Sequence, residues 1–105
     1  MLEKEIEKIL KDEVKKAGGK AYKWTSPGND GVPDRIVIFP DSIPIFVELK
    51  TEIGKLSKVQ KAQIRRLKEL GQQVEVVRGV TGLIAFFAFY GRQEVAERLK
   101  EKYMP

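Results

Sequence analysis

Two short apolar runs on either side of a turn constrain the fold of this sequence most strongly. Residues 35–39 read R-I-V-I-F and residues 45–50 read I-F-V-E-L-K, with the turn residues Pro40, Asp41 and Ser42 between them. This pattern predicts a β-hairpin. A helical pattern that ends near Leu70 and a further strand over residues 73–78 follow it. The hairpin and the strand-helix-strand crossover together predict a mixed sheet flanked by helices.

The sequence before and after the hairpin and the crossover predicts the remaining elements, which gives an α-β-β-β-α-β-α order. Residues 2–17 carry apolar side chains at helical spacing, and a glycine pair ends that helix. A short β-rich run over residues 21–25 precedes the loop before the hairpin. Thr81 predicts the N-cap of a third helix, and residues 92–103 resume an amphipathic pattern after Gly91. Because we find no linker or repeat in the 105 residues, we expect one domain over residues 1–105.

The amino-acid composition restricts the kinds of catalytic and metal-binding sites that this chain can form. Cysteine and histidine are absent, which excludes disulfides, thiolate or histidine metal sites and histidine-based triads. A metal ion would need oxygen ligands, which favours Mg²⁺ or Mn²⁺. The formal net charge of +5 is compatible with nucleic-acid binding. No apolar run is long enough to cross a membrane and no signal-peptide pattern begins the chain, so we expect a cytoplasmic protein.

Charged residues on the predicted hairpin gather on one side of it. Glu48 and Lys50 are two positions apart on a strand, so their side chains share a face. Asp34 begins the neighbouring strand, and the hairpin can bring its carboxylate close to that of Glu48. Two close carboxylates repel each other unless a divalent cation lies between them. The alternative is ordinary turn chemistry at Pro33 and Asp34 beside a solvated pair of Glu48 and Lys50.

Three motifs together resemble a known family. They are G-V-P-D at residues 31–34, V-E-L-K at 47–50 and L-S-K-V-Q at 56–60. Their order and spacing are similar to those of the VRR-NUC branch of the PD-(D/E)xK nucleases, and the resemblance covers most of the chain. It implies a restriction-endonuclease-like α-β-β-β-α-β core, with a mixed sheet flanked by helices and a C-terminal helical segment beyond it.

The same resemblance implies an activity. The expected function is a Mg²⁺- or Mn²⁺-dependent DNA endonuclease that hydrolyses phosphodiester bonds in a bacterial or phage-infected host cell. Similarity to Holliday-junction resolvases favours selectivity for DNA structure. The alternatives are a nuclease on flap, nicked or single-stranded DNA, and a non-catalytic basic DNA-binding module.

The resemblance also assigns roles to residues of the hairpin. It implies that Asp34 and Glu48 bind the metal ion, with the backbone carbonyl of Leu49 as a further ligand. Lys50 would orient or activate the attacking water and offset negative charge in the transition state. These roles agree with the general need of phosphodiester hydrolysis for positive charge around an anionic substrate.

Two further catalytic candidates lie outside the hairpin. The family has a glutamate in the first helix, and Glu3 matches it best. Glu3 also lies about 60° from the centre of the apolar helical stripe, whereas Glu5 and Glu7 lie about 100° away; the alternative is a solvated charge at the helix N-terminus. Gln60 lines the active site in the family, and it also stands three residues after Ser57, where it completes a capping box.

Basic side chains are candidates for contacts to DNA phosphates. The candidates are Lys55, Lys58, Lys61 and Arg65 on the second helix and its approach, together with Lys23 and Arg35. The alternative for the helix is an ordinary solvated face. Trp24 can stack on a base or pack within the protein, and we favour packing.

The third helix carries an apolar stretch that exceeds the need of one amphipathic helix. Residues 83–90 read L-I-A-F-F-A-F-Y, so the stretch is either wholly buried or in contact with another copy of the chain. We hypothesise a homodimer through this helix from Leu83 to Tyr90. A two-fold axis would then relate two active sites.

Overall fold

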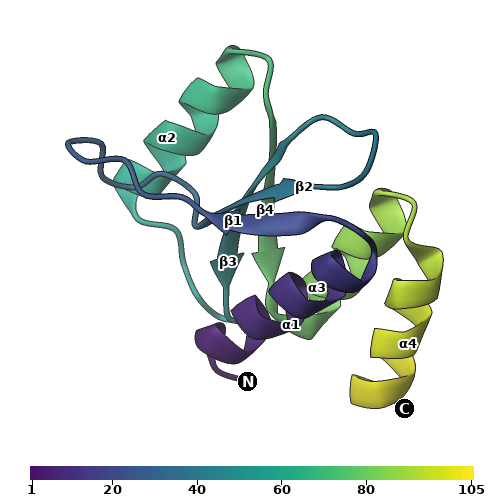
Figure 1. Cartoon of the computed structure of the whole chain (residues 1–105). Helices are drawn as coiled ribbons and strands as arrows, with labels where there is room; N and C mark the ends of the chain where they lie inside the picture. The colour runs from purple at the N-terminus through teal and green to yellow at the C-terminus, as the bar shows by residue number, and fades with distance from the viewer.

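A four-stranded mixed sheet forms the centre of the protein in the computed structural model, which describes residues 1–105 (Figure 1). The strands lie side by side in the order β1 (Lys20–Lys23), β2 (Arg35–Ile38), β3 (Ile45–Lys50) and β4 (Gln73–Arg78). The first three strands are antiparallel, and β3 and β4 are parallel. The predicted hairpin and crossover are therefore confirmed.

Four helices cover the sheet. They are α1 (Glu3–Lys16), α2 (Lys58–Glu69), α3 (Gly79–Phe89) and α4 (Gln93–Tyr103). Apolar side chains of α1, α3 and α4 form one cluster with one face of the sheet. The helix α2 instead connects β3 to β4 and packs against β4 from the opposite side. In Figure 1 α2 accordingly stands apart from the other three helices.

Side chains of the central strands alternate between the two faces of the sheet, as the two-residue period of a strand requires. In β3, Ile45, Val47 and Leu49 are fully buried and face the three-helix side, which we call the inward face. Phe46 and Lys50 lie on the other face and are only partly buried. We call this the outward face. Packing of the hydrophobic core on the inward face thus leaves the outward-facing residues of each strand available for a functional site.

The start of α3 differs from the prediction. The helix begins at Gly79, directly after β4, and no side chain caps it. The predicted N-cap at Thr81 is therefore wrong. Gly79 has a φ of +59°, a backbone conformation that glycine adopts without strain, and this lets the chain pass directly from strand to helix.

Much of the apolar stretch over residues 83–90 packs in the core of the same chain. Leu83, Phe86 and Phe87 are buried in the core, whereas Phe89 is 76% exposed. Only a narrow part of this helix is therefore free to contact anything else. None of the helices has the length and apolarity that crossing a lipid bilayer requires.

Leu10→Ala should destabilise the protein by about 3 kcal/mol because Leu10 is fully buried between α1 and the sheet, where its removal leaves a cavity. Leu70→Ala is the matched control, since Leu70 is 56% exposed at the end of α2 and its loss should cost at most about 0.5 kcal/mol. Urea unfolding of both variants measures the difference. Equal losses would contradict the assigned core.

Candidate active site

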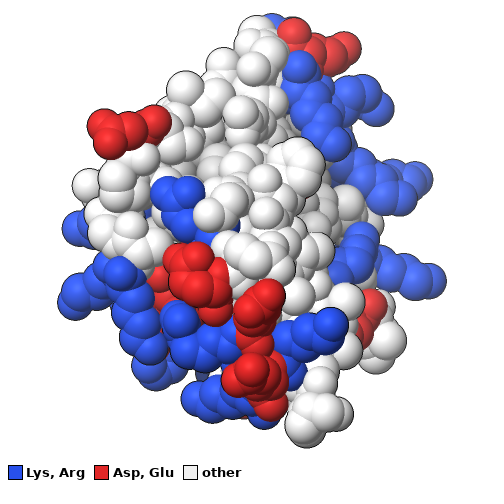
Figure 2. Space-filling view, turned by 90° about the vertical axis from the view of Figure 1, so that its right-hand side faces the viewer, with Lys and Arg blue, Asp and Glu red and all other residues white.

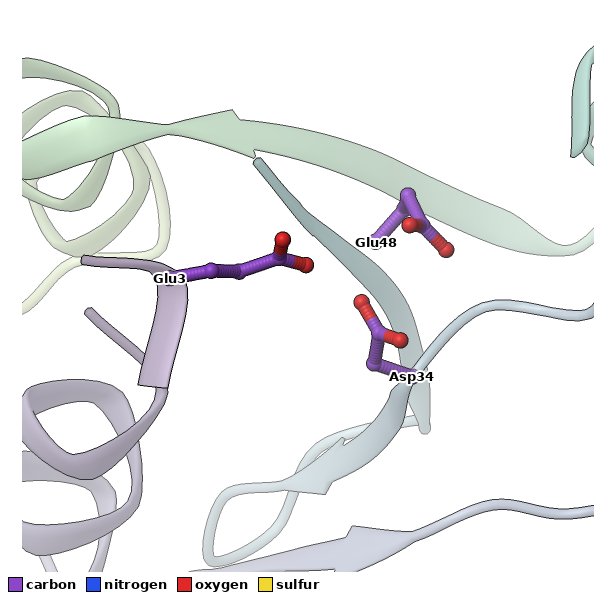
Figure 3. A group of neighbouring side chains, drawn as sticks. All are labelled: Glu3, Asp34 and Glu48. Carbon is purple, nitrogen blue, oxygen red and sulfur yellow. The ribbon is translucent and has the colours of Figure 1, made fainter. Parts of the chain in front are cut away.

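The register of β2 and β3 brings two carboxylates together. Arg35 pairs with Val47, so one further step along the hairpin sets Asp34 opposite Glu48. Both side chains lie on the outward face. Figure 3 shows the carboxylates of Asp34, Glu48 and Glu3, the last from α1, pointing toward a common space. One oxygen of each lies within 4.8 Å of an oxygen of the other two.

Asp34 is held by the backbone of the adjacent strand. The Leu49 N–H donates a hydrogen bond of 2.8 Å to Asp34 Oδ2. The carboxylate therefore extends the hairpin ladder beyond its last backbone pair and has one fixed orientation. Sequence reasoning assigned only the carbonyl of Leu49 a role and missed its N–H. Antiparallel register, counted one step past Arg35, is the signal that indicates the contact.

The loop before Asp34 is pressed against the start of α2. Gly31 has a φ of +84°, and a Cβ there would lie 2.7 Å from Val59 Cγ1 and 2.9 Å from the Gln60 nitrogen. The Gln63 amide also donates to the Asp30 carbonyl at 3.2 Å. This approach is possible only for glycine. It links the position of Asp34 to that of Gln60.

Glu48 is the deepest of the three acids, with 1% of its surface exposed. Its Oε2 accepts a hydrogen bond from Gln60 Nε2 at 3.1 Å and lies 3.7 Å from Lys50 Nζ. Its Oε1 is buried and has no hydrogen-bond partner. An unpartnered buried carboxylate oxygen is costly, and this one belongs to the cluster formed with Asp34 and Glu3.

Burial raises the pKa of Glu48 from 4.5 to about 7, and the charge of Asp34 adds to the shift while Lys50 opposes it. Desolvation and a like charge both penalise the ionised carboxyl. The site therefore contains more negative charge than its own surroundings stabilise, and a cation would relieve that imbalance.

Gln60 completes the predicted capping box and also contacts Glu48. The side-chain Oε1 of Gln60 accepts from the Ser57 backbone N–H at 2.9 Å, and the backbone N–H of Gln60 donates to Ser57 Oγ at 3.1 Å. The two bonds confirm the capping box. Its Nε2 reaches Glu48. The cap of α2 therefore fixes the amide that holds Glu48.

Three glutamates near the start of the first helix have separate surroundings. Glu3 is exposed and joins the acidic cluster. Glu5 accepts from the Leu2 N–H at 3.0 Å, and Glu7 lies 2.9 Å from Arg35 Nη2. Of the three glutamates, Glu3 is thus the one whose carboxylate joins the cluster.

Arg35 does not lie where a DNA contact requires. Its side chain is 10% exposed, pairs with Glu7 and donates to the Ala21 carbonyl at 3.1 Å. As the neighbour of Asp34 on β2, it points to the inward face, where α1 covers it. The expected phosphate contact by Arg35 is therefore not supported, and the residue ties α1 to the sheet.

The other basic candidates are all exposed, and they are Lys23, Lys55, Lys58, Lys61 and Arg65. The last two line a shallow groove on α2 with Ile64 and Leu56. Figure 2 shows, for one face of the molecule, that Lys and Arg side chains border a broad uncharged area on one side, whereas basic and acidic side chains are mixed below it. Positive charge is thus unevenly distributed over that face.

Trp24 packs, as expected. Its ring centroid lies 5.1 Å from that of Phe46, and its backbone N–H donates to the Asp34 carbonyl at 3.0 Å. The tryptophan therefore stands directly beside Asp34 on the adjacent chain segment. Sequence reasoning did not anticipate this proximity.

Comparison with known proteins places the chain in a family. Residues 2–81 match the family model of the VRR-NUC domain. The chain belongs to the VRR-NUC domain family. The matched residues of this VRR-NUC chain run from α1 to the first turn of α3 and include Glu3, Asp34, Glu48, Lys50 and Gln60.

Individual relatives agree with this assignment. A protein named "Putative nuclease p44", from Acyrthosiphon pisum secondary endosymbiont phage 1, is 58% identical over 48 residues, which are 46% of this VRR-NUC chain and 52% of the relative. The match thus spans about half the length of that relative. A solved VRR_NUC domain is 27% identical, with a TM-score of 0.68 and coverage of 96% of each chain. A second solved VRR_NUC domain protein has a TM-score of 0.69 at 16% identity over 89% of this chain and 90% of its own, and it supports the fold alone.

Glu48→Gln should change how stability depends on pH in the presence of EDTA. Between about pH 4.5 and pH 7 the folded protein keeps a proton on Glu48 that the unfolded chain has lost. The contribution of this group to stability therefore declines as the pH rises through that window, and it is constant above it. We expect the free energy of unfolding of the wild type to fall relative to that of Glu48→Gln over the same range.

Urea titrations at several pH values measure this difference. Glu97→Gln, at an exposed position on α4, is the control and should run parallel to the wild type. A constant difference between wild type and Glu48→Gln from pH 4.5 to pH 8 would show that the pKa of Glu48 is not raised.

Proposed function

We propose that this chain is a metal-dependent DNA endonuclease that hydrolyses phosphodiester bonds and selects its substrate by structure. The observation that carries the proposal is the convergence of Asp34, Glu48 and Lys50 on one face of the hairpin, with Glu3 closing the cluster. Membership of the VRR-NUC family and the nuclease name of the phage relative agree with it.

The acidic cluster fits a hard divalent cation. Its donors are all carboxylate oxygens, the ligands that Mg²⁺ and Mn²⁺ prefer. The buried Glu48 Oε1 has no partner of its own. Glu3, Asp34 and Glu48 would hold the ion, and the Leu49 carbonyl remains a proposed further ligand. A bound Mg²⁺ or Mn²⁺ would neutralise phosphate charge and make water a better nucleophile.

The chain's own residues supply orientation and charge. Lys50, with a side chain only 15% exposed, presents its ammonium group beside Glu48 at the edge of the cluster. There it can orient a water molecule and stabilise negative charge that develops on the phosphate. Gln60 holds Glu48 Oε2 and leaves the unpartnered Oε1 available.

Exposed lysines and arginines would hold the DNA backbone. The candidates on α2 and its approach are Lys55, Lys58, Lys61 and Arg65, and Lys23 lies at the end of β1. Contacts of this kind position a nucleic acid without reading its sequence. They are consistent with recognition of DNA structure.

Lys50→Ala should lower kcat about 100-fold or more, because it removes a positive charge from the reacting phosphate. Cleavage of labelled duplex, nicked, flap, single-stranded and four-way DNA with Mg²⁺ or Mn²⁺ measures the effect and reveals the preferred substrate. Lys102→Ala is the matched control, since Lys102 lies on α4 outside the site, and it should cleave like the wild type.

Two results would count against the catalytic proposal. Cleavage that survives EDTA would remove the metal requirement, and cleavage unaffected by Lys50→Ala would remove the proposed site. Tight binding of DNA without any cleavage would favour the alternative of a basic DNA-binding module.

A homodimer through α3 is part of the proposal. Phe89 is 76% exposed and lines a hollow of ≈270 Å³ with Ala85, Tyr90 and Val76 of the edge strand β4. A two-fold axis would let Phe89 of each copy enter the hollow of the other, which gives a self-complementary interface. Two active sites in fixed relation would suit a branched DNA substrate.

Phe89→Asp should convert the dimer to a monomer at micromolar concentration, because it introduces a charge into the apolar contact. Sedimentation velocity measures the change in mass. Ile53→Asp, at a loop position that is 90% exposed, is the control and should leave the mass unaltered. A monomeric wild type at the same concentration would refute the interface.

A further inference from the structure

The outward face of β1, β2 and β3 carries an aromatic and aliphatic strip that the fold leaves open. Its members are Tyr22, Trp24, Ile36, Ile38 and Phe46, which we call the aromatic strip. Tyr22 pairs with Ile36, and Ile36 with Phe46, so these three stand in one row across the sheet. Tyr22 is 48% exposed, Ile38 is 36% exposed and the other three are partly buried.

The position of α2 explains why the strip is open. This helix packs over β4, at the far edge of the same face. The remaining helices pack on the inward face through the main core, which contains none of the five residues of the strip. The protein therefore buries one whole face of the hairpin but leaves much of the other to solvent, beside the acidic cluster.

The strip begins at the proposed active site. The backbone N–H of Trp24 donates to the Asp34 carbonyl, and the Trp24 ring lies against Phe46. Phe46 is two residues before Glu48 on β3 and points to the same face. Two strand spacings and two residues separate Tyr22 from Glu48, which corresponds to about 12 Å. A stacked strand covers that distance with about three to four nucleotides.

Charge around the strip favours a nucleic acid over a second copy of the chain. Lys20 shares the outward face with Tyr22, and its Nζ lies 4.7 Å from the centre of the Tyr22 ring. A copy of this chain related by a two-fold axis would bring its own Lys20 against this one. A nucleic-acid strand instead offers flat bases to the aromatic rings and a phosphate to Lys20.

We infer that the aromatic strip binds unpaired bases of the DNA strand next to the phosphate in the active site. One base stacks on the exposed face of Tyr22, and Lys20 contacts a flanking phosphate. This inference rests on the proposed nuclease function and deepens it, because it names DNA with unpaired nucleotides beside the cleavage point as the substrate class.

Binding in EDTA tests the strip without relying on cleavage. The probes are a blunt DNA hairpin and the same hairpin with a five-nucleotide single-stranded overhang. Trp24 is the only tryptophan, so quenching of its fluorescence reports base contact directly. We expect the wild type to bind the overhang probe more tightly than the blunt one, with stronger quenching.

Tyr22→Ala should weaken binding of the overhang probe roughly 5- to 100-fold and leave the blunt probe unaffected, since stacking requires the ring. Tyr22→Phe keeps the ring and should bind within about twofold of the wild type. Photo-crosslinking of the wild type with 5-iodouracil in the overhang should label the strip, as mapped by mass spectrometry, and this readout needs no variant.

Equal affinity of the wild type for both probes would overturn the inference. An unchanged overhang affinity in Tyr22→Ala, or crosslinks that map away from the strip, would do the same. A loss of dimer mass in Tyr22→Ala would also overturn it, because the strip would then belong to an interface between copies. Cleavage of other DNA by wild-type protein in Mg²⁺ would leave the proposed function standing in each case.

Discussion

The register of the β2–β3 hairpin is the constraint on which the rest of the site depends. Val37, Ile45 and Val47 are fully buried on the inward face, so a slip of one residue would expose an apolar set and bury a polar one. The same register sets Asp34 opposite Glu48 on the outward face. Core packing on one side of the hairpin thus determines carboxylate geometry on the other.

The first turn of α2 is a second part of the fold that fixes the position of the site residues. Ser57 and Gln60 close the capping box, and the same Gln60 amide holds Glu48. Gly31 brings the loop before Asp34 into contact with this first turn. Asp34 and Glu48 are therefore fixed both through the hairpin and through the helix cap. The two carboxylates remain close although their charges repel.

Simple periodicity was enough to predict much of the fold and of the site. The two-residue period placed Glu48 and Lys50 on one face, and the helical angle distinguished Glu3 from Glu5 and Glu7. The order of strands and helices followed from turn chemistry and apolar patterns, and the structure has that order.

The errors came from tertiary context. The predicted phosphate contact of Arg35 fails because its position next to Asp34 directs the side chain to the inward face, where Glu7 pairs with it. The cap at Thr81 failed because Gly79 lets α3 begin without a loop. The Glu7 contact has no local signal, since it joins α1 to β2, whereas the strand-to-helix passage depends on Gly79 itself.

Burial of Glu48 has a consequence for binding as well as for stability. A carboxyl group with a pKa of about 7 is protonated in about half of the molecules at neutral pH. A proton and a bound cation would therefore compete for the same oxygens, and affinity for a divalent ion should increase with pH through this range. Relief of the repulsion between Asp34 and Glu48 by such an ion would add to the stability of the fold. The buried charge that destabilises the hairpin would thus favour a cation at this position.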